Sequence, residues 1–180
     1  DEGFDIISGL FGNTMGLYES RKGKLYANEE VRKNIQANLQ PLDILLEKTP
    51  FRLTDKFIPG HFGHVAIWTG SKAELIDMEL WDNDYVKAHA GKISSSENAD
   101  SKGENQIIEA LRSGVQLSSL EHFMNIDDFA ILRPIFPKES DEELRKEALL
   151  MAFRQLGKAY DFNFDVNTTE KIVCLELLEN

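Results

Sequence analysis

Apolar residues between positions 140 and 157 return every three or four positions, which is the spacing of one face of an α-helix. This face consists of Leu144, Ala148, Leu149, Ala152, Phe153 and Leu156. Ser140 and Glu143 have the spacing of a capping box, and Gly157 follows the last apolar position as a helix-ending glycine does. The pattern therefore predicts a helix over 141–156.

Three further helices are predicted, two of them from capping signals. Asn28 can cap a helix over 28–39, because the two glutamates that follow it put acid at the positive end of the helix dipole. Residues 118–124 predict a short helix. A second capping region at 168–170 predicts a last helix, on which Cys174 would fall.

Shorter apolar runs bounded by proline and glycine predict strands. They cover 42–46, 64–69, 74–78, 106–110 and 128–133. The stretch over 79–105 is polar and predicts a surface insertion with a mobile tip, and the glycine-rich first 25 residues predict a loosely ordered arm. Several strands in one sheet, with helices towards the two sequence ends, indicate an α+β fold.

Composition narrows the class of protein. With 180 residues, 42% of them hydrophobic and 28% charged, the chain fits one globular domain with its own core. A net charge of -11 argues against nucleic-acid partners and against adsorption to anionic lipid. No apolar run approaches the roughly 20 residues that span a bilayer, so no membrane span is expected. Because the chain begins at Asp1, a processed precursor or a trimmed chain is expected.

The single cysteine, Cys174, excludes an internal disulfide and leaves the compartment open. Together with His64, which begins an apolar strand, it supplies the minimum equipment of a thiol hydrolase, since an imidazole can deprotonate a thiol and hold it as the thiolate. A buried structural thiol is the alternative, and free cysteines are often buried. His64 could equally be a satisfied histidine at the edge of a core.

Glu109 is an acid in the middle of an apolar strand. Two interpretations fit it equally: it orients an imidazole as the third member of a triad, or it points to water from an edge strand. His61 and His64 form an H-x-x-H pair, and an acidic run lies between 77 and 84. Neither has the ligand spacing of a zinc site or an EF-hand, so no metal and no cofactor are expected.

Four segments carry motifs in a fixed order. They are LQPLDILL at 39–46, IPG at 58–60 with HVAIWTG at 64–70, IIEA at 107–110 with GV at 114–115, and GKAYD at 157–161 with CLEL at 174–177. Taken together, with ILRP at 131–134, they resemble the permuted papain-like branch of the NlpC-type cysteine hydrolases, the YiiX-like group. The resemblance covers roughly 39–180.

This resemblance implies a circularly permuted papain-like fold, with an antiparallel sheet packed with helices. It divides the chain into an N-terminal arm and helix over 1–38 and a hydrolase domain over 39–180, with the insertion at about 79–105. The family's nucleophile falls on Cys174, its base on His64 and its imidazole-orienting acid on Glu109. Two positions depart from the family pattern: Leu175 replaces a serine and Leu42 replaces a glycine.

The implied activity is cleavage of amide bonds in small or cell-wall-type peptides through an acyl-enzyme. Tyr160 or Tyr85 would assist backbone N–H groups at the oxyanion, and Asp43 would bind a substrate amine. The alternatives are a lipid acyl hydrolase or acyltransferase of the same fold and a non-catalytic ligand-binding module. The resemblance favours a bacterial envelope or exported protein, and the sequence gives neither the substrate nor the oligomeric state.

Overall fold

The computed structural model describes residues 19–52, 60–93, 105–160 and 171–172. The helices are α2 (Glu29–Asn38), α3 (Lys72–Asp77), α4 (Asp84–Lys87), α5 (Leu120–Phe123) and α6 (Asp141–Arg154). The strands are β1 (Ile44–Lys48), β2 (His64–Trp68), β3 (Asn105–Leu111), β4 (Gly114–Ser119), β5 (Asp128–Leu132), β6 (Ala159–Tyr160) and β7 (Lys171–Ile172). This content confirms the α+β prediction.

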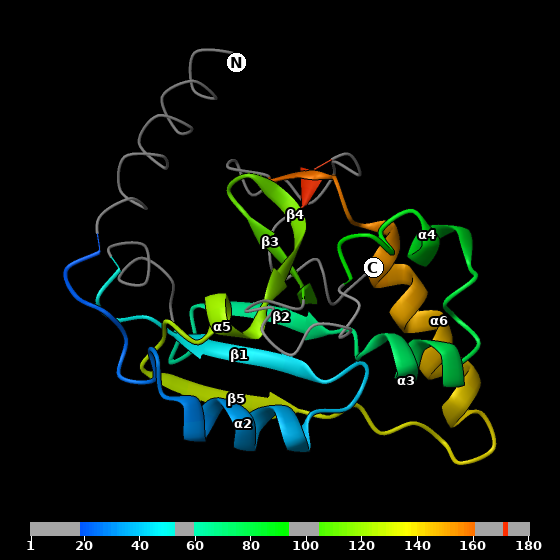
Figure 1. Cartoon of the computed structure of the whole chain (residues 1–180), viewed down its shortest axis with the longest axis horizontal. Helices are drawn as coiled ribbons and strands as arrows, with labels where there is room; N and C mark the ends of the chain where they lie inside the picture. The colour runs from blue at the N-terminus through cyan, green and yellow to red at the C-terminus, as the bar shows by residue number, and fades with distance from the viewer. Residues whose placement is uncertain (1–18, 53–59, 94–104, 161–170, 173–180) are drawn as a thin grey trace.

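Five strands form one antiparallel sheet in the order β4-β3-β2-β1-β5 (Figure 1). Strand β2 lies at its centre, between β1 and β3. The register pairs Glu47 with His64 across β1 and β2, and Ala66 with Glu109 across β2 and β3. Glu109 is therefore on an interior strand, and the edge-strand interpretation of this residue is wrong.

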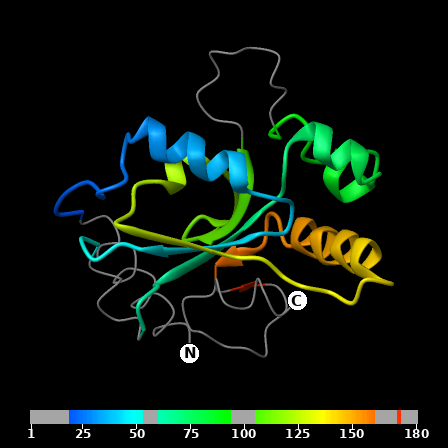
Figure 2. The same ribbon diagram turned by 90° about the horizontal axis from the view of Figure 1, so that it is seen from below.

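Side chains alternate between the two faces of the sheet, and each face carries its own core cluster. Ala66, Trp68 and Ile107 pack with α5 and with apolar residues of α2. Ile67 and Ile108 pack on the opposite face with residues of α3, α4 and α6. Figure 2 shows α2 above the strands and α6 to their right, lower in the view than α2. His64 and Glu109 share the parity of Ala66 and Ile107, so both belong to the face that α5 covers.

Helix α2 follows the prediction, since the Asn28 side chain accepts from the backbone N–H of Val31 at 3.1 Å. Helix α6 also follows it, and Gly157 beyond its end has φ +89° in the left-handed region that glycine tolerates. The predicted capping box at the start of α6 is wrong, because Ser140 makes no side-chain cap hydrogen bond.

The strand predicted over 74–78 is wrong, because these residues continue helix α3 and its C-cap. Ser71 and Glu74 form a complete capping box there, with the Ser71 backbone N–H donating to the Glu74 carboxylate at 2.7 Å. This box satisfies two backbone donors at the start of the helix and outweighs the apolar run that suggested a strand.

The remaining strand predictions hold, with shifts of one or two residues at their ends. Strand β4 was not predicted, and it takes the first two residues of the helix predicted over 118–124. The helix there, α5, begins after Ser119, whose hydroxyl accepts from the backbone N–H of His122 at 3.1 Å. A serine between a strand and a helix thus ends one and caps the other.

The described part of the polar stretch, 79–93, contributes to the core. Leu80, Val86 and Ile93 are buried in the cluster that packs with α6. Packing rather than composition therefore decides the place of this segment. Residues 94–104 lie outside the described residues, and the limits of the insertion stay a prediction.

The segment before α2 is tied to the turn that precedes β5. Arg21 donates from both terminal nitrogens to Asp127, one of them at 2.7 Å, and this pairing holds the pKa of the Asp127 carboxyl well below its usual range. Gly23 lies against the backbone of Ile126, where an added Cβ would come within 2.3 Å of the nitrogen. This close approach requires glycine.

The end of α6 is joined to the β3–β4 hairpin by backbone hydrogen bonds. Val115 N–H donates to the Lys158 carbonyl, and Gly157 N–H donates to the Val115 carbonyl, each at 2.9 Å. Two motifs that are far apart in the sequence are therefore adjacent here. Strand β6 follows at once and pairs in parallel with β7. The helix predicted from 168–170 is wrong at residues 171–172, which form that strand.

Candidate active site

The imidazole of His64 and the carboxylate of Glu109 form a close buried pair. Nε2 of His64 lies 2.9 Å from Oε2 of Glu109, and the two side chains are 14% and 3% exposed. This distance is that of a charge-assisted hydrogen bond. Two of the three residues predicted as catalytic are thus in contact, although 45 positions separate them.

The sheet itself holds this pair together. His64 begins β2, and Glu109 lies opposite Ala66, so the two residues are diagonal neighbours on one face of adjacent strands. Because both strands are in the interior of the sheet, their backbones are fixed from both sides. The geometry therefore belongs to the rigid part of the fold.

The charge of Glu109 is stabilised by its neighbours. Burial on its own would raise the pKa of the Glu109 carboxyl, but hydrogen bonding to His64, the charge of His64, a contact with Ser118 and the charge of His122 together lower it. The carboxylate is consequently ionised at neutral pH. An ionised acid at this place fixes the imidazole tautomer and stabilises an imidazolium.

An aromatic ring and a second acid also lie close to His64. The Phe123 ring of α5 lies 6.4 Å from the His64 ring, centre to centre. Glu47 is directly opposite His64 on β1 and is buried, and its Oε1 lies 3.6 Å from Arg52. Glu47 is not among the residues predicted from the sequence. The sequence shows only an acid two positions after Leu45, on the same face if the strand predicted over 42–46 continues, and its place beside His64 comes from the pairing of β1 with β2.

Asp43 lies at the other end of β1, away from His64. It is fully buried and receives two hydrogen bonds from the guanidinium of Arg133, at 2.7 and 2.8 Å, and one from the backbone N–H of Gln40 at 2.8 Å. These partners occupy both carboxylate oxygens and indicate a structural role. Leu42, just before it, has φ +73°, in the left-handed region that glycine adopts more readily than other residues.

The two tyrosines predicted to assist lie near the core cluster that packs with α6. Tyr160 of β6 packs against this cluster, on the sheet face opposite to His64 and Glu109. Tyr85, the second residue of α4, is 44% exposed, and the Arg154 guanidinium lies over its ring at 4.7 Å from the ring centre. The structure does not bring either ring to the His64–Glu109 pair. Cys174 lies outside the described residues.

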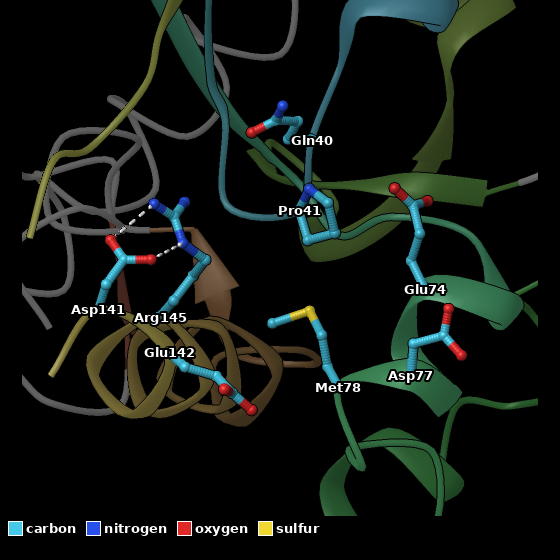
Figure 3. Close-up of a pocket in the computed structure, with 8 residues that line it drawn as sticks. All are labelled: Gln40, Pro41, Glu74, Asp77, Met78, Asp141, Glu142 and Arg145. Carbon is cyan, nitrogen blue, oxygen red and sulfur yellow. Dashed lines mark hydrogen bonds and ion pairs between the residues drawn. The ribbon is translucent and has the colours of Figure 1, made fainter. Parts of the chain in front are cut away.

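A separate pocket of about 450 Å³ lies between α3 and α6 (Figure 3). Figure 3 shows the ion pair of Asp141 and Arg145 on one wall and Glu74 and Asp77 on the other. The loop before β1 closes one side of the pocket, and the His64–Glu109 pair does not line it. The pocket is therefore distinct from the candidate active site. Acidic side chains outnumber the single arginine in its lining, so the pocket carries a net negative charge.

The two histidines of the H-x-x-H motif contact different acids. His61 pairs with Asp128 at 3.0 Å on the surface, whereas His64 pairs with Glu109. In the part of the chain that the structure describes, no three His, Cys, Asp or Glu side chains come together as metal ligands. None of the described helices is long and apolar enough to cross a bilayer.

Comparison with known families gives one match. The family described as "permuted papain-like amidase enzyme, YaeF/YiiX, C92 family" matches residues 38–180, which begins one residue before the first motif of the sequence analysis. The match covers most of the chain and confirms the resemblance that the motifs indicated. Searches among curated proteins and solved structures found no match.

Proposed function

Because the chain belongs to the YaeF/YiiX-type family of permuted papain-like amidases, and is therefore a cysteine hydrolase that acts on amide bonds, we propose that Cys174, His64 and Glu109 carry out its reaction. The observation that carries this proposal is the buried 2.9 Å contact between His64 Nε2 and Glu109 Oε2. It supplies an imidazole whose orientation and charge are controlled by an acid, as thiol catalysis requires.

The nucleophile follows from the sequence. A cysteine hydrolase needs one reactive thiol, and Cys174 is the only cysteine in the chain. It comes two positions after β7, which pairs with β6 beside the β3–β4 hairpin. The antiparallel register directs the start of β2, where His64 lies, and the end of β3 towards the same end of the sheet. Chain order and topology thus support Cys174 as the partner of His64.

The two ring nitrogens have different roles in this proposal. Nε2 of His64 is hydrogen-bonded to Glu109, so we assign Nδ1 to the thiol of Cys174. Nδ1 takes the thiol proton, and the carboxylate of Glu109 stabilises the imidazolium that forms. Glu109 itself stays ionised throughout, in agreement with its lowered pKa.

The reaction then has two stages. The thiolate of Cys174 attacks the carbonyl carbon, a C–S bond forms, and the C–N bond breaks as the His64 imidazolium gives its proton to the leaving amine. In the second stage His64 takes a proton from water and the hydroxide attacks the thioester carbonyl. The C–S bond then breaks, the acid leaves, and the His64 imidazolium returns its proton to the Cys174 thiolate. Backbone N–H groups would stabilise each oxyanion.

The substrates we propose are small or cell-wall-type peptides, by extension from the amidase description of the family. The test is a panel of peptide amides, including cell-wall fragments, beside an acyl ester of a lipid, with product release followed by mass spectrometry. Wild type is expected to release amine and acid from a peptide amide, whereas Cys174→Ala releases none. Turnover of the lipid ester alone would contradict the peptide proposal, and turnover by Cys174→Ala would contradict the nucleophile.

A further inference from the structure

The carboxylate of Glu109 has one oxygen that its known partner does not use. Oε2 is bonded to His64, but no group among the described residues meets hydrogen-bond geometry with Oε1, and this atom is buried. A buried oxygen of an ionised carboxylate without a donor is costly, and buried polar atoms are nearly always paired. Oε1 therefore identifies a place where a donor is expected.

The sheet restricts which side chain can be that donor. The same-face neighbours of Glu109 on β2 are Ala66, directly opposite, with His64 and Trp68 on the diagonals. Ala66 has no donor, His64 is bonded to Oε2, and Trp68 packs into the apolar cluster with Leu45. Strand β2 thus offers no further donor that contacts Oε1.

Strand β4 offers three same-face positions. Gln116 is directly opposite Glu109, but its side-chain oxygen accepts from the Ser113 hydroxyl at 2.8 Å near the hairpin turn. Gly114 has no side chain. Ser118 is the remaining diagonal neighbour, and only 5% of it is exposed. It is also among the groups that lower the pKa of the Glu109 carboxyl.

We propose that Ser118 is a positioning residue, whose hydroxyl donates to Oε1 of Glu109 and so holds the carboxylate that orients His64. A serine hydroxyl can rotate among its staggered positions, so this donation requires no movement of the backbone. Both oxygens of the carboxylate then have a donor, one from each neighbouring strand. The inference rests on the proposed function and extends the Cys174–His64–Glu109 arrangement by one residue.

The test is the pH dependence of Cys174 alkylation by iodoacetamide in the full chain. Ser118→Thr and Ser118→Val form a matched pair, because they have nearly the same shape and differ in the hydroxyl. Loss of the donor raises the pKa of the Glu109 carboxyl. The acid limb of the profile, where the alkylation rate falls towards low pH, should therefore lie about half a unit to one unit higher in Ser118→Val than in Ser118→Thr. The Thr variant should follow wild type, and so should Ser113→Ala, which removes an exposed serine of the same hairpin.

Other titratable groups that face the Glu109 carboxylate or the His64 imidazole also influence the pH dependence of alkylation. They are His64 on β2, His122 on α5 and Glu47 on β1, and all three are unchanged in the Ser118 variants. A purely structural role for Ser118 would lower the thermal midpoint of the Val variant but leave the limb in place. Coincident Thr and Val limbs would therefore overturn the inference.

Glu109→Gln separates this inference from the proposed function. If Glu109→Gln changes the profile and Ser118→Val does not, only the role of Ser118 is wrong. If Glu109→Gln follows wild type, the proposed role of Glu109 is wrong, and the role of Ser118 is overturned with it. A Val variant that does not fold is replaced by Ser118→Ala, judged by the same shift.

Discussion

Replacing Glu109 by glutamine removes one charge from the proposed site and keeps its shape. The amide oxygen of glutamine can still accept from Nε2 of His64, so the 2.9 Å contact can be retained as a neutral hydrogen bond. What is lost is the ability to stabilise an imidazolium. Because His64 and Glu109 are both largely shielded from water, this loss is not screened by solvent.

The size of the effect follows from hydrogen-bond energies. Hydrogen bonds to charged groups contribute about 1.5–3 kcal/mol, and neutral ones about 0.5–1.5 kcal/mol. Their difference is about 1–2 kcal/mol, which corresponds to a rate loss of about 5- to 30-fold if it acts on the transition state. We therefore expect that, at pH 7, iodoacetamide alkylates Cys174 about 5- to 30-fold more slowly in Glu109→Gln than in wild type. Hydrolysis of a peptide amide should slow by the same factor.

Folding stability gives a second, independent measurement of this substitution. The pKa of Glu109 is lower in the folded chain than the ordinary value of 4.5, so its ionised form favours folding. That contribution is present above about pH 4.5 and is lost as the pH falls through the lowered pKa. Urea unfolding should thus find Glu109→Gln less stable than wild type at pH 7, with a gap that narrows below pH 4.5.

Glu121→Gln is the control, because it makes the same charge change at an exposed position of α5. It should leave both the alkylation rate and the pH dependence of stability unchanged. If Cys174 is alkylated at the wild-type rate in Glu109→Gln, the Glu109 carboxylate does not act on the His64 imidazole. If its stability gap to wild type does not depend on pH, the electrostatic account of the pair is refuted.

Two further predictions concern the frame of the site, and urea unfolding checks both. Arg133→Ala should lower the free energy of unfolding by about 3 kcal/mol, since it leaves a fully buried carboxylate at Asp43 without its cation. Asp43→Asn in the same chain should recover part of this loss, and a wild-type midpoint for Arg133→Ala would contradict the structural role. Gly23→Ala should cost at least about 2 kcal/mol, because its Cβ would overlap the backbone of Ile126. Gly91→Ala is its control, since nothing lies within 4 Å of that Cβ; equal effects of the two glycine variants would refute the packing argument.

The sequence predicted most of the elements that position the site, for identifiable reasons. The run at 64–69 became β2 because β-branched and aromatic residues dominate it, and the run at 106–110 became part of β3, with Ile107 and Ile108 as its β-branched residues. Strand β4 was missed because its second half is polar, and its place is decided by pairing with β3. Helix α3 was predicted as a strand from the apolar residues at 74–78, and the capping box that begins at Ser71 was overlooked.

The contacts of the site divide in the same way. The His64–Glu109 pair could be anticipated, because motif order indicated both residues and the register of two neighbouring strands brings them together. The partner of Asp43 could not, since Arg133 comes 90 positions later and only the fold makes it adjacent. Glu47 was missed for a similar reason: its proximity to His64 depends on the pairing of β1 with β2.

The central claim is that Cys174 and His64 form a reactive thiolate–imidazolium pair. The most direct test measures the rate of Cys174 alkylation by iodoacetamide from pH 4 to pH 10 in wild type and in His64→Ala. The account predicts a reactive thiolate below about pH 7 in wild type only, with the variant titrating near the ordinary thiol value of about 8.5. An ordinary thiol titration in both proteins would contradict the claim.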